Sequence, residues 1–144
     1  MKGARTKARK RALDLLYAAE LRGDDPIATL DGAIEEGAGP TNDYTADIVR
    51  GVVAEQARID ELLATYSRGW TLARMPAIDR NVLRIGAWEI LCVDDVPDVV
   101  AVSEAMSLVE ELSTDESPAF VNGVLDTLMR QKDRNVVNEK FLDG

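Results

Sequence analysis

Apolar residues recur along this chain every three or four positions, in stretches that end at short turn signals. That spacing puts them on one face of a helix, and no stretch alternates apolar and polar residues over the length of a strand. The clearest stretches lie at about residues 5–22, 26–36, 43–66, 77–93, 98–112 and 117–132. The pattern therefore predicts an all-α fold, a compact bundle of six or seven helices.

Residues that begin helices lie at the edges of these stretches. Asp25 is placed to cap the second helix, with Pro26 at its first position, and Ser117 and Pro118 have the same relation to the sixth. The predicted inward-facing positions are Leu13, Leu16, Tyr17 and Leu21 in the first helix and Val99, Val102, Met106 and Val109 in the fifth.

Short connections between consecutive helices favour antiparallel neighbours. We therefore expect two helical subgroups, made of the first three and the last three helices. A connector at residues 67–76 would join them, with Trp70 and Leu72 anchoring it to the core.

The length of 144 residues suits one domain with one continuous core. We expect residues 1–132 to form a single helical domain that opens with a basic arm at 1–11, and residues 133–144 to form a polar C-terminal tail. No apolar run reaches the roughly 20 residues needed to cross a bilayer. The basic N-terminus also lacks the apolar stretch of a signal peptide, so the expected location is the cytoplasm.

The sequence lacks the side chains on which most catalytic and metal sites depend. It has no histidine and one cysteine, Cys92, which excludes a Cys/His zinc site, an internal disulfide and a histidine base. Cys92 lies in an apolar stretch and is expected to be a buried thiol. Neither a GxxxxGK[ST] nor a GxGxxG phosphate-binding motif is present. We expect no enzymatic activity, no cofactor and no metal.

Charge is distributed unevenly along the chain. The net charge is −9, but residues 2–11 contain six cations and no acid, so the remainder carries −15. The six cations are Lys2, Arg5, Lys7, Arg9, Lys10 and Arg11. A projecting basic arm of this kind would wrap a phosphate backbone and release counterions, which predicts RNA binding. The alternative is a solvated, frayed terminus.

Two further groups of residues are candidates for binding. Phe120, at a helix start, could stack on an unpaired base while Asn122 bonds a base edge; alternatively Phe120 is core and Asn122 bonds local backbone. Gly123 is expected to allow close helix packing.

Asp79 and Arg80 begin the fourth helix, and Tyr66 lies near the connector. An aromatic residue beside charged residues is a common anchor of protein interfaces, so these three residues predict a surface for a protein partner. The alternative is a contact between the two subgroups in the folded chain.

Five segments, in order along the chain, resemble the NusB family. They are Arg9-x-x-Ala12-x-x-x-Leu16-Tyr17; Tyr44 with Val49-x-Gly51-Val52 and Ile59-Asp60; Asp79-Arg80-x-x-Leu83-Arg84-x-Gly86-x-x-Glu89; Pro97-x-x-Val100-Ala101-Val102-x-Glu104-Ala105; and Phe120-Val121-Asn122-Gly123-Val124-Leu125-Asp126. Together they span roughly residues 5–130, and the last segment is the most specific.

The resemblance implies an all-helical fold and a role in bacterial transcription antitermination. It implies binding to the boxA element of nascent RNA, notably ribosomal RNA, together with the small-subunit ribosomal protein NusE. The transcription elongation complex and other Nus factors follow as further partners, and no membrane is expected. The sequence is compatible with a monomer and with a homodimer. The alternative function is a helical protein–protein interaction module in which RNA binding is incidental.

Overall fold

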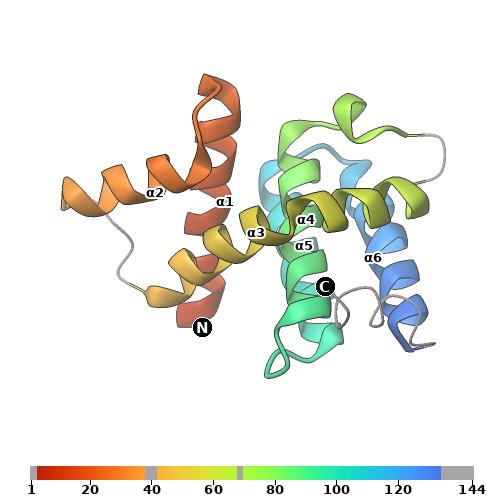
Figure 1. Ribbon diagram of the computed structural model, residues 1–144. Helices are drawn as coiled ribbons and strands as arrows, with labels where there is room; N and C mark the ends of the chain where they lie inside the picture. Colours follow the sequence, from red (N-terminus) through yellow and green to blue (C-terminus); the bar gives the residue numbers. More distant parts are fainter. Residues whose placement is uncertain (1–2, 38–41, 68–69, 134–144) are drawn as a thin grey trace. The chain divides into compact units, whose positions relative to one another are not determined.

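The structure, a computed structural model, describes residues 3–37, 42–67 and 70–133. Within these residues it consists of helices and contains no strand, which confirms the predicted all-α fold (Figure 1). The elements are α1 (Ala4–Arg22), α2 (Pro26–Glu35), α3 (Asp43–Tyr66), a 3-10 turn η1 (Leu72–Arg74), α4 (Ala77–Cys92), α5 (Asp98–Leu112) and α6 (Ser117–Asp133). No helix in the described part of the chain is long and apolar enough to cross a membrane.

The helices divide into two compact units, Met1–Gln56 and Ala57–Gly144. The sequence predicted a boundary at the connector, but the boundary lies inside α3. The reason is an ion pair within the second unit: Arg84 of α4 donates from Nε and Nη2 to the two carboxylate oxygens of Asp60 of α3, at 2.8 and 2.9 Å. This two-point contact assigns the last turns of α3, and the connector after them, to the second unit.

In the first unit, α1 and α2 pack against each other across a tight turn. Gly23 ends α1 in the left-handed conformation, with φ of 70°, and the N–H of Asp24 bonds to the carbonyl of Ala19 at 2.8 Å. Asp25 then caps α2, accepting from the N–H of Ile27 at 3.4 Å, and Pro26 takes the first helical position. The predicted cap at Asp25 and the predicted start of the helix at Pro26 are confirmed.

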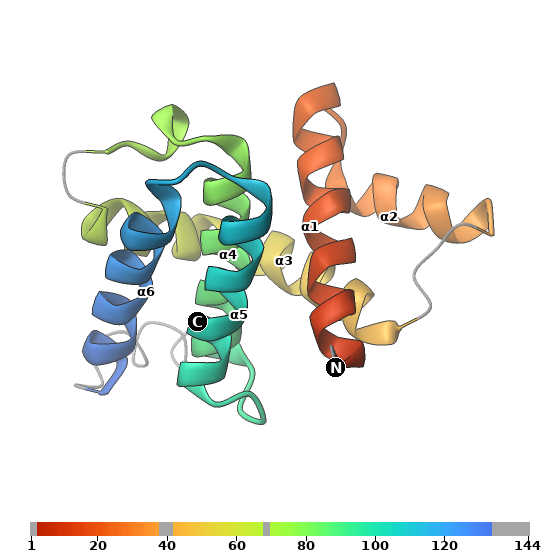
Figure 2. The ribbon, with the colours of Figure 1, turned by 180° about the vertical axis from the view of Figure 1, so that it is seen from behind.

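The second unit is built around α4, on which α5 and α6 pack side by side (Figure 2). Gly86 of α4 marks the closest approach. A Cβ atom at this position would lie 2.9 Å from Cδ1 of Leu125 on α6 and 3.7 Å from Cβ of Ala105 on α5. Because a side chain at position 86 would displace the fully buried Leu125, packing favours glycine here.

The predicted burial was wrong for part of three helices, α5, α1 and α4. On α5, Val99 is 67% exposed, and the buried positions are Ala101, Ala105, Leu108 and Val109. Leu21 of α1 is 65% exposed, and Cys92 is exposed instead of buried. The buried face of α5 is set by its packing against α4, which Ala105 approaches at Gly86.

Replacing Gly86 by valine is expected to lower the free energy of unfolding by about 1–3 kcal/mol, because the added carbons overpack the contact with the fully buried Leu125. Urea denaturation followed by circular dichroism would measure the change.

Gly32→Ala is the control. Gly32 lies within α2, and a Cβ there would meet nothing within 4 Å. Alanine at position 32 should raise stability, by up to about 1 kcal/mol. A Gly86→Val variant as stable as the unmodified protein would show that the two helices do not meet at this glycine.

Candidate nucleic-acid interface

The start of α1 is positively charged. Its first turns carry cations and no acid, whereas α3, α4 and α5 each carry an aspartate in the first turn, at Asp43, Asp79 and Asp98. The first turns of α2 and α6 carry no acid either. Cations at a helix N-terminus oppose the positive end of the helix dipole. The same dipole and the unpaired backbone N–H groups attract anions. The first turns of α1 are therefore better suited to binding a polyanion than to stabilising the helix.

Tyr44, at the start of α3, holds this part of α1 in place. The guanidinium carbon of Arg5 lies 4.2 Å from the centre of the Tyr44 ring, and that of Arg9 lies 5.7 Å from it. Both distances are within the range of cation–π attraction. Like charges four residues apart on a helix repel each other, so the shared ring offsets this repulsion.

Hydrogen bonds add to this contact between the starts of α1 and α3. The hydroxyl of Thr45, which is buried, donates to the carbonyl of Ala8 at 3.0 Å. Asn42 caps α3, because its Oδ1 accepts from the N–H of Tyr44 at 2.8 Å. Tyr44 and Thr45 were not predicted as site residues, because their contacts are with residues of α1 that lie far earlier in the sequence.

The expected projecting arm is a helix instead. Residues 4–11 belong to α1, and Ala8 and Arg9 are only 2% and 3% exposed. The predicted arm was wrong because Ala8 and Ala12 form a small buried face that continues the core toward the N-terminus, and alanine gives a weak hydrophobic signal.

The six predicted cations therefore differ in accessibility. Arg5 and Lys7 are exposed, Lys10 and Arg11 are partly exposed, and Arg9 is buried against Tyr44. Lys2 lies outside the described residues. Lys7, which is exposed, and Lys10, which is partly exposed, are accessible to a phosphate group.

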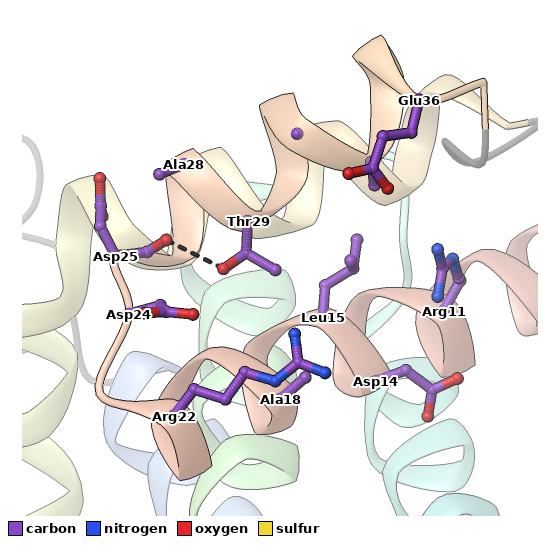
Figure 3. Close-up of a pocket in the computed structure, with 12 residues that line it drawn as sticks. Arg11, Asp14, Leu15, Ala18, Arg22, Asp24, Asp25, Ala28, Thr29 and Glu36 are labelled. Atoms are coloured by element: carbon purple, nitrogen blue, oxygen red, sulfur yellow. Dashed lines mark hydrogen bonds between the residues drawn. The ribbon is translucent and has the colours of Figure 1, made fainter.

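Arg11 lines a groove of about 510 Å³ between α1 and α2 (Figure 3). Arg11 and Arg22 extend from α1 at this groove, and Glu36 reaches toward it from α2. Its lining also includes Asp14, Asp24 and Asp25, so carboxylates outnumber guanidinium groups. The groove therefore repels phosphate and does not extend the basic surface. In the described part of the chain, no group of three or more acidic or cysteine side chains is arranged to hold a metal ion.

Phe120 and Asn122 lie on the first turns of α6. Phe120 is half-buried, and its ring centre lies 5.0 Å from that of Trp70, with a tilt of 49° between the planes. Trp70 was expected to anchor the connector in the core; instead it packs on Phe120 and remains 46% exposed. Asn122 is exposed. An aromatic pair with an open indole face therefore stands at the start of α6.

Asp79 forms hydrogen bonds within the second unit. It is 1% exposed, and its two carboxylate oxygens accept hydrogen bonds from Ser113 at 2.5 Å and Ser117 at 2.7 Å. Because the Ser117 proton goes to Asp79, Thr114 is the donor in its 2.8 Å contact with Ser117. The network ties the start of α4 to the start of α6.

Arg80 also forms hydrogen bonds within the second unit. Its Nη1 donates to the carbonyls of Leu72 and Met75, at 2.7 and 3.0 Å, and so closes the η1 turn onto α4. Tyr66 is half-buried. The sequence placed Asp79 and Arg80 on a partner surface, but the structure gives both residues a different role because their polar groups are bonded within the second unit.

Comparisons with known proteins agree on one family. The model of the NusB family matches residues 6–130. A transcription antitermination protein NusB from Nocardioides sp. is 70% identical over 129 residues, which are 90% of this chain and 96% of that protein. Two solved structures are similar in fold. T. maritima NusB has a TM-score of 0.80 at 30% identity, covering 90% of this chain and 93% of that chain. A chain in a structure of antitermination factors NusB and NusE with dsRNA has a TM-score of 0.78 at 25% identity, covering 91% of this chain and 99% of that chain.

Replacing Asp79 by asparagine is expected to lower the free energy of unfolding by about 2 kcal/mol. An amide offers one acceptor oxygen where two serine hydroxyls now donate, so one buried group loses its partner. Chemical denaturation would measure the loss. Asp115→Asn is the matched control, because Asp115 is exposed. Equal stability of the two variants would contradict the structural role of Asp79.

Proposed function

The chain belongs to the NusB family, and on that basis we propose that it is an RNA-binding transcription antitermination factor with no enzymatic activity. It binds boxA-type RNA of nascent transcripts, notably ribosomal RNA, together with the ribosomal protein NusE. It acts in the bacterial cytoplasm, where it joins the elongation complex with other Nus factors. The observation that carries the proposal is the extensive similarity to antitermination proteins, over nearly the whole of this chain and of the relative.

The basic start of α1 supports RNA as the ligand. Lys7 and Lys10 lie on a helix N-terminus that has no acid in its first turn, and the contacts with Tyr44 and Thr45 hold this turn in place. A positive surface that is already ordered loses little conformational entropy when it meets a phosphate backbone. Each phosphate that it neutralises releases counterions, which favours binding at low salt.

The acidic remainder of the chain supports a second, basic partner. Outside residues 2–11 the chain carries −15, which opposes binding of a polyanion by this protein alone. A basic protein would be attracted to that charge and would reduce the repulsion felt by RNA. A solved structure contains NusB and NusE together with RNA, and NusE is the partner that we propose for this chain. RNA should therefore bind more tightly when NusE is present.

The alternative function is a protein interaction module in which RNA binding is incidental. The two functions differ in how RNA affinity depends on the cations of α1. Incidental binding would depend on net charge, so that removing any two exposed cations would have the same effect. Specific binding would depend on Lys7 and Lys10.

The double variant Lys7→Gln/Lys10→Gln is expected to bind labelled boxA-type RNA more weakly than the unmodified protein. Its plot of log affinity against log salt concentration should be less steep, by about 0.7 for each single-strand phosphate contact that is lost. Fluorescence anisotropy over a series of salt concentrations, with and without NusE, would measure both effects.

The control removes the same charge elsewhere in the first unit. Arg22→Gln/Arg50→Gln changes two exposed cations outside residues 2–11. It should leave the salt dependence of RNA affinity nearly unchanged. If both double variants bind RNA equally, the interaction follows net charge and the alternative function is favoured. Deleting residues 1–11 is a poor test, because it would remove Ala8 and Arg9 from the packed face of α1.

A further inference from the structure

Gly123 has no packing role within the described part of the chain. It lies within α6, it is exposed, and a Cβ there would meet nothing within 4 Å. The sequence predicted that this glycine allows close helix packing, and the structure contradicts that, since a Cβ at Gly123 would meet no atom of another described element. Glycine is unfavourable in a helix interior. Its presence at an open position is typical of a surface that another molecule approaches closely.

The aromatic pair stands on the same part of α6. Phe120 is three residues before Gly123 and therefore adjacent to it on the helix surface. Trp70 packs on Phe120 with ring centres 5.0 Å apart, and nearly half of Trp70 is exposed. An indole backed by a second ring has little freedom to turn away, so its open face is presented in a fixed orientation. Trp70 and Gly123 therefore both neighbour Phe120, Trp70 through the ring contact and Gly123 along the surface of α6.

The charges around this surface decide what kind of group it suits. Asp115 and Glu116, which precede α6, are exposed acids, and Asn122 offers an exposed amide. The two carboxylates repel phosphate but accept hydrogen bonds from the amino groups of bases. The surface therefore suits the base of a nucleotide, which is flat and uncharged. The cationic start of α1 suits the phosphate instead.

We propose that the exposed ring of Trp70, backed by Phe120, stacks on an unpaired base of the bound RNA, and that the sugar of that nucleotide lies against Gly123. Stacking of bases on aromatic side chains is the usual way in which proteins hold single-stranded RNA. The inference rests on the proposed RNA-binding function and adds to it a contact that does not depend on ionic attraction.

The test measures binding of labelled boxA-type RNA by the full chain at several salt concentrations. Trp70→Ala should weaken binding by roughly 5- to 150-fold, the range found for loss of one stacked base. The salt dependence should stay the same, because no phosphate contact is lost. Trp70→Phe keeps an aromatic ring and should retain most of the affinity.

Gly123→Ala is the sharper variant, since it should act in opposite directions on stability and on binding. The midpoint of urea denaturation should rise, because alanine favours the helix and the added methyl meets nothing in the chain. RNA affinity should fall several-fold, because the methyl occupies the space of the nucleotide. Gly32→Ala makes the same change at an open position of α2, so it should raise the midpoint without affecting RNA affinity.

Tryptophan fluorescence gives an independent readout. The chain has two tryptophans, and Trp88 is 9% exposed, so quenching by RNA should come from Trp70 and disappear in Trp70→Phe. Unchanged RNA affinity in both Trp70→Ala and Gly123→Ala would overturn the inference, while a weakened Lys7→Gln/Lys10→Gln variant would leave the proposed function standing. If Trp70→Ala instead loses affinity for NusE in the absence of RNA and keeps its RNA affinity, the pair is a protein-binding surface and the inference is wrong.

Discussion

The second unit depends on the close approach of α6 to α4 at Gly86. With no side chain at that point, Leu125 sits against the α4 backbone and is fully buried. Two polar contacts then fix the ends of α6. Ser117 bonds to the buried Asp79 at its start, and near its end Lys132 donates from Nζ to the carbonyl of Ile90 at 2.7 Å and to Asp98 at 2.9 Å. Because α6 is held at its start, middle and end, the surface on its first turns is well ordered.

An ordered surface at the start of α6 favours the binding of a flexible ligand. A single-stranded RNA loses conformational freedom when it binds, and a surface that must also become ordered would add to this loss. Trp70 illustrates how the fold reduces the conformational freedom that the protein surface would lose on binding. The residue follows α3 in a connector, where an exposed indole would normally turn freely, but its contact with Phe120 restricts it. Phe120 in turn is fixed by α6, so the orientation of an exposed side chain depends on the buried contact at Gly86.

In the first unit the dominant constraint is electrostatic. Five cations between Arg5 and Arg11 repel one another and oppose the dipole of α1, the helix in which they lie. The Tyr44 ring offsets part of this repulsion by attracting Arg5 and Arg9. The acidic remainder of the chain sets a second limit, because it repels the ligand that the start of α1 attracts. The same charge distribution accounts for an RNA-binding protein that works with a basic protein partner.

The helices could be predicted from the amino-acid sequence, since caps, prolines and apolar spacing act over a few residues. The sequence also showed the cations of residues 2–11 and, through five ordered segments, the resemblance to the family. The accessibility of individual side chains, in contrast, depends on how the helices pack. Arg9 is buried against Tyr44, Asp79 is bonded to a serine 38 residues away, and Trp70 is exposed on Phe120. The buried face of α5 also depends on α4, which Ala105 approaches at Gly86. Burial and pairing of a side chain depend on the elements that pack against it, and residues distant in sequence bring those elements together.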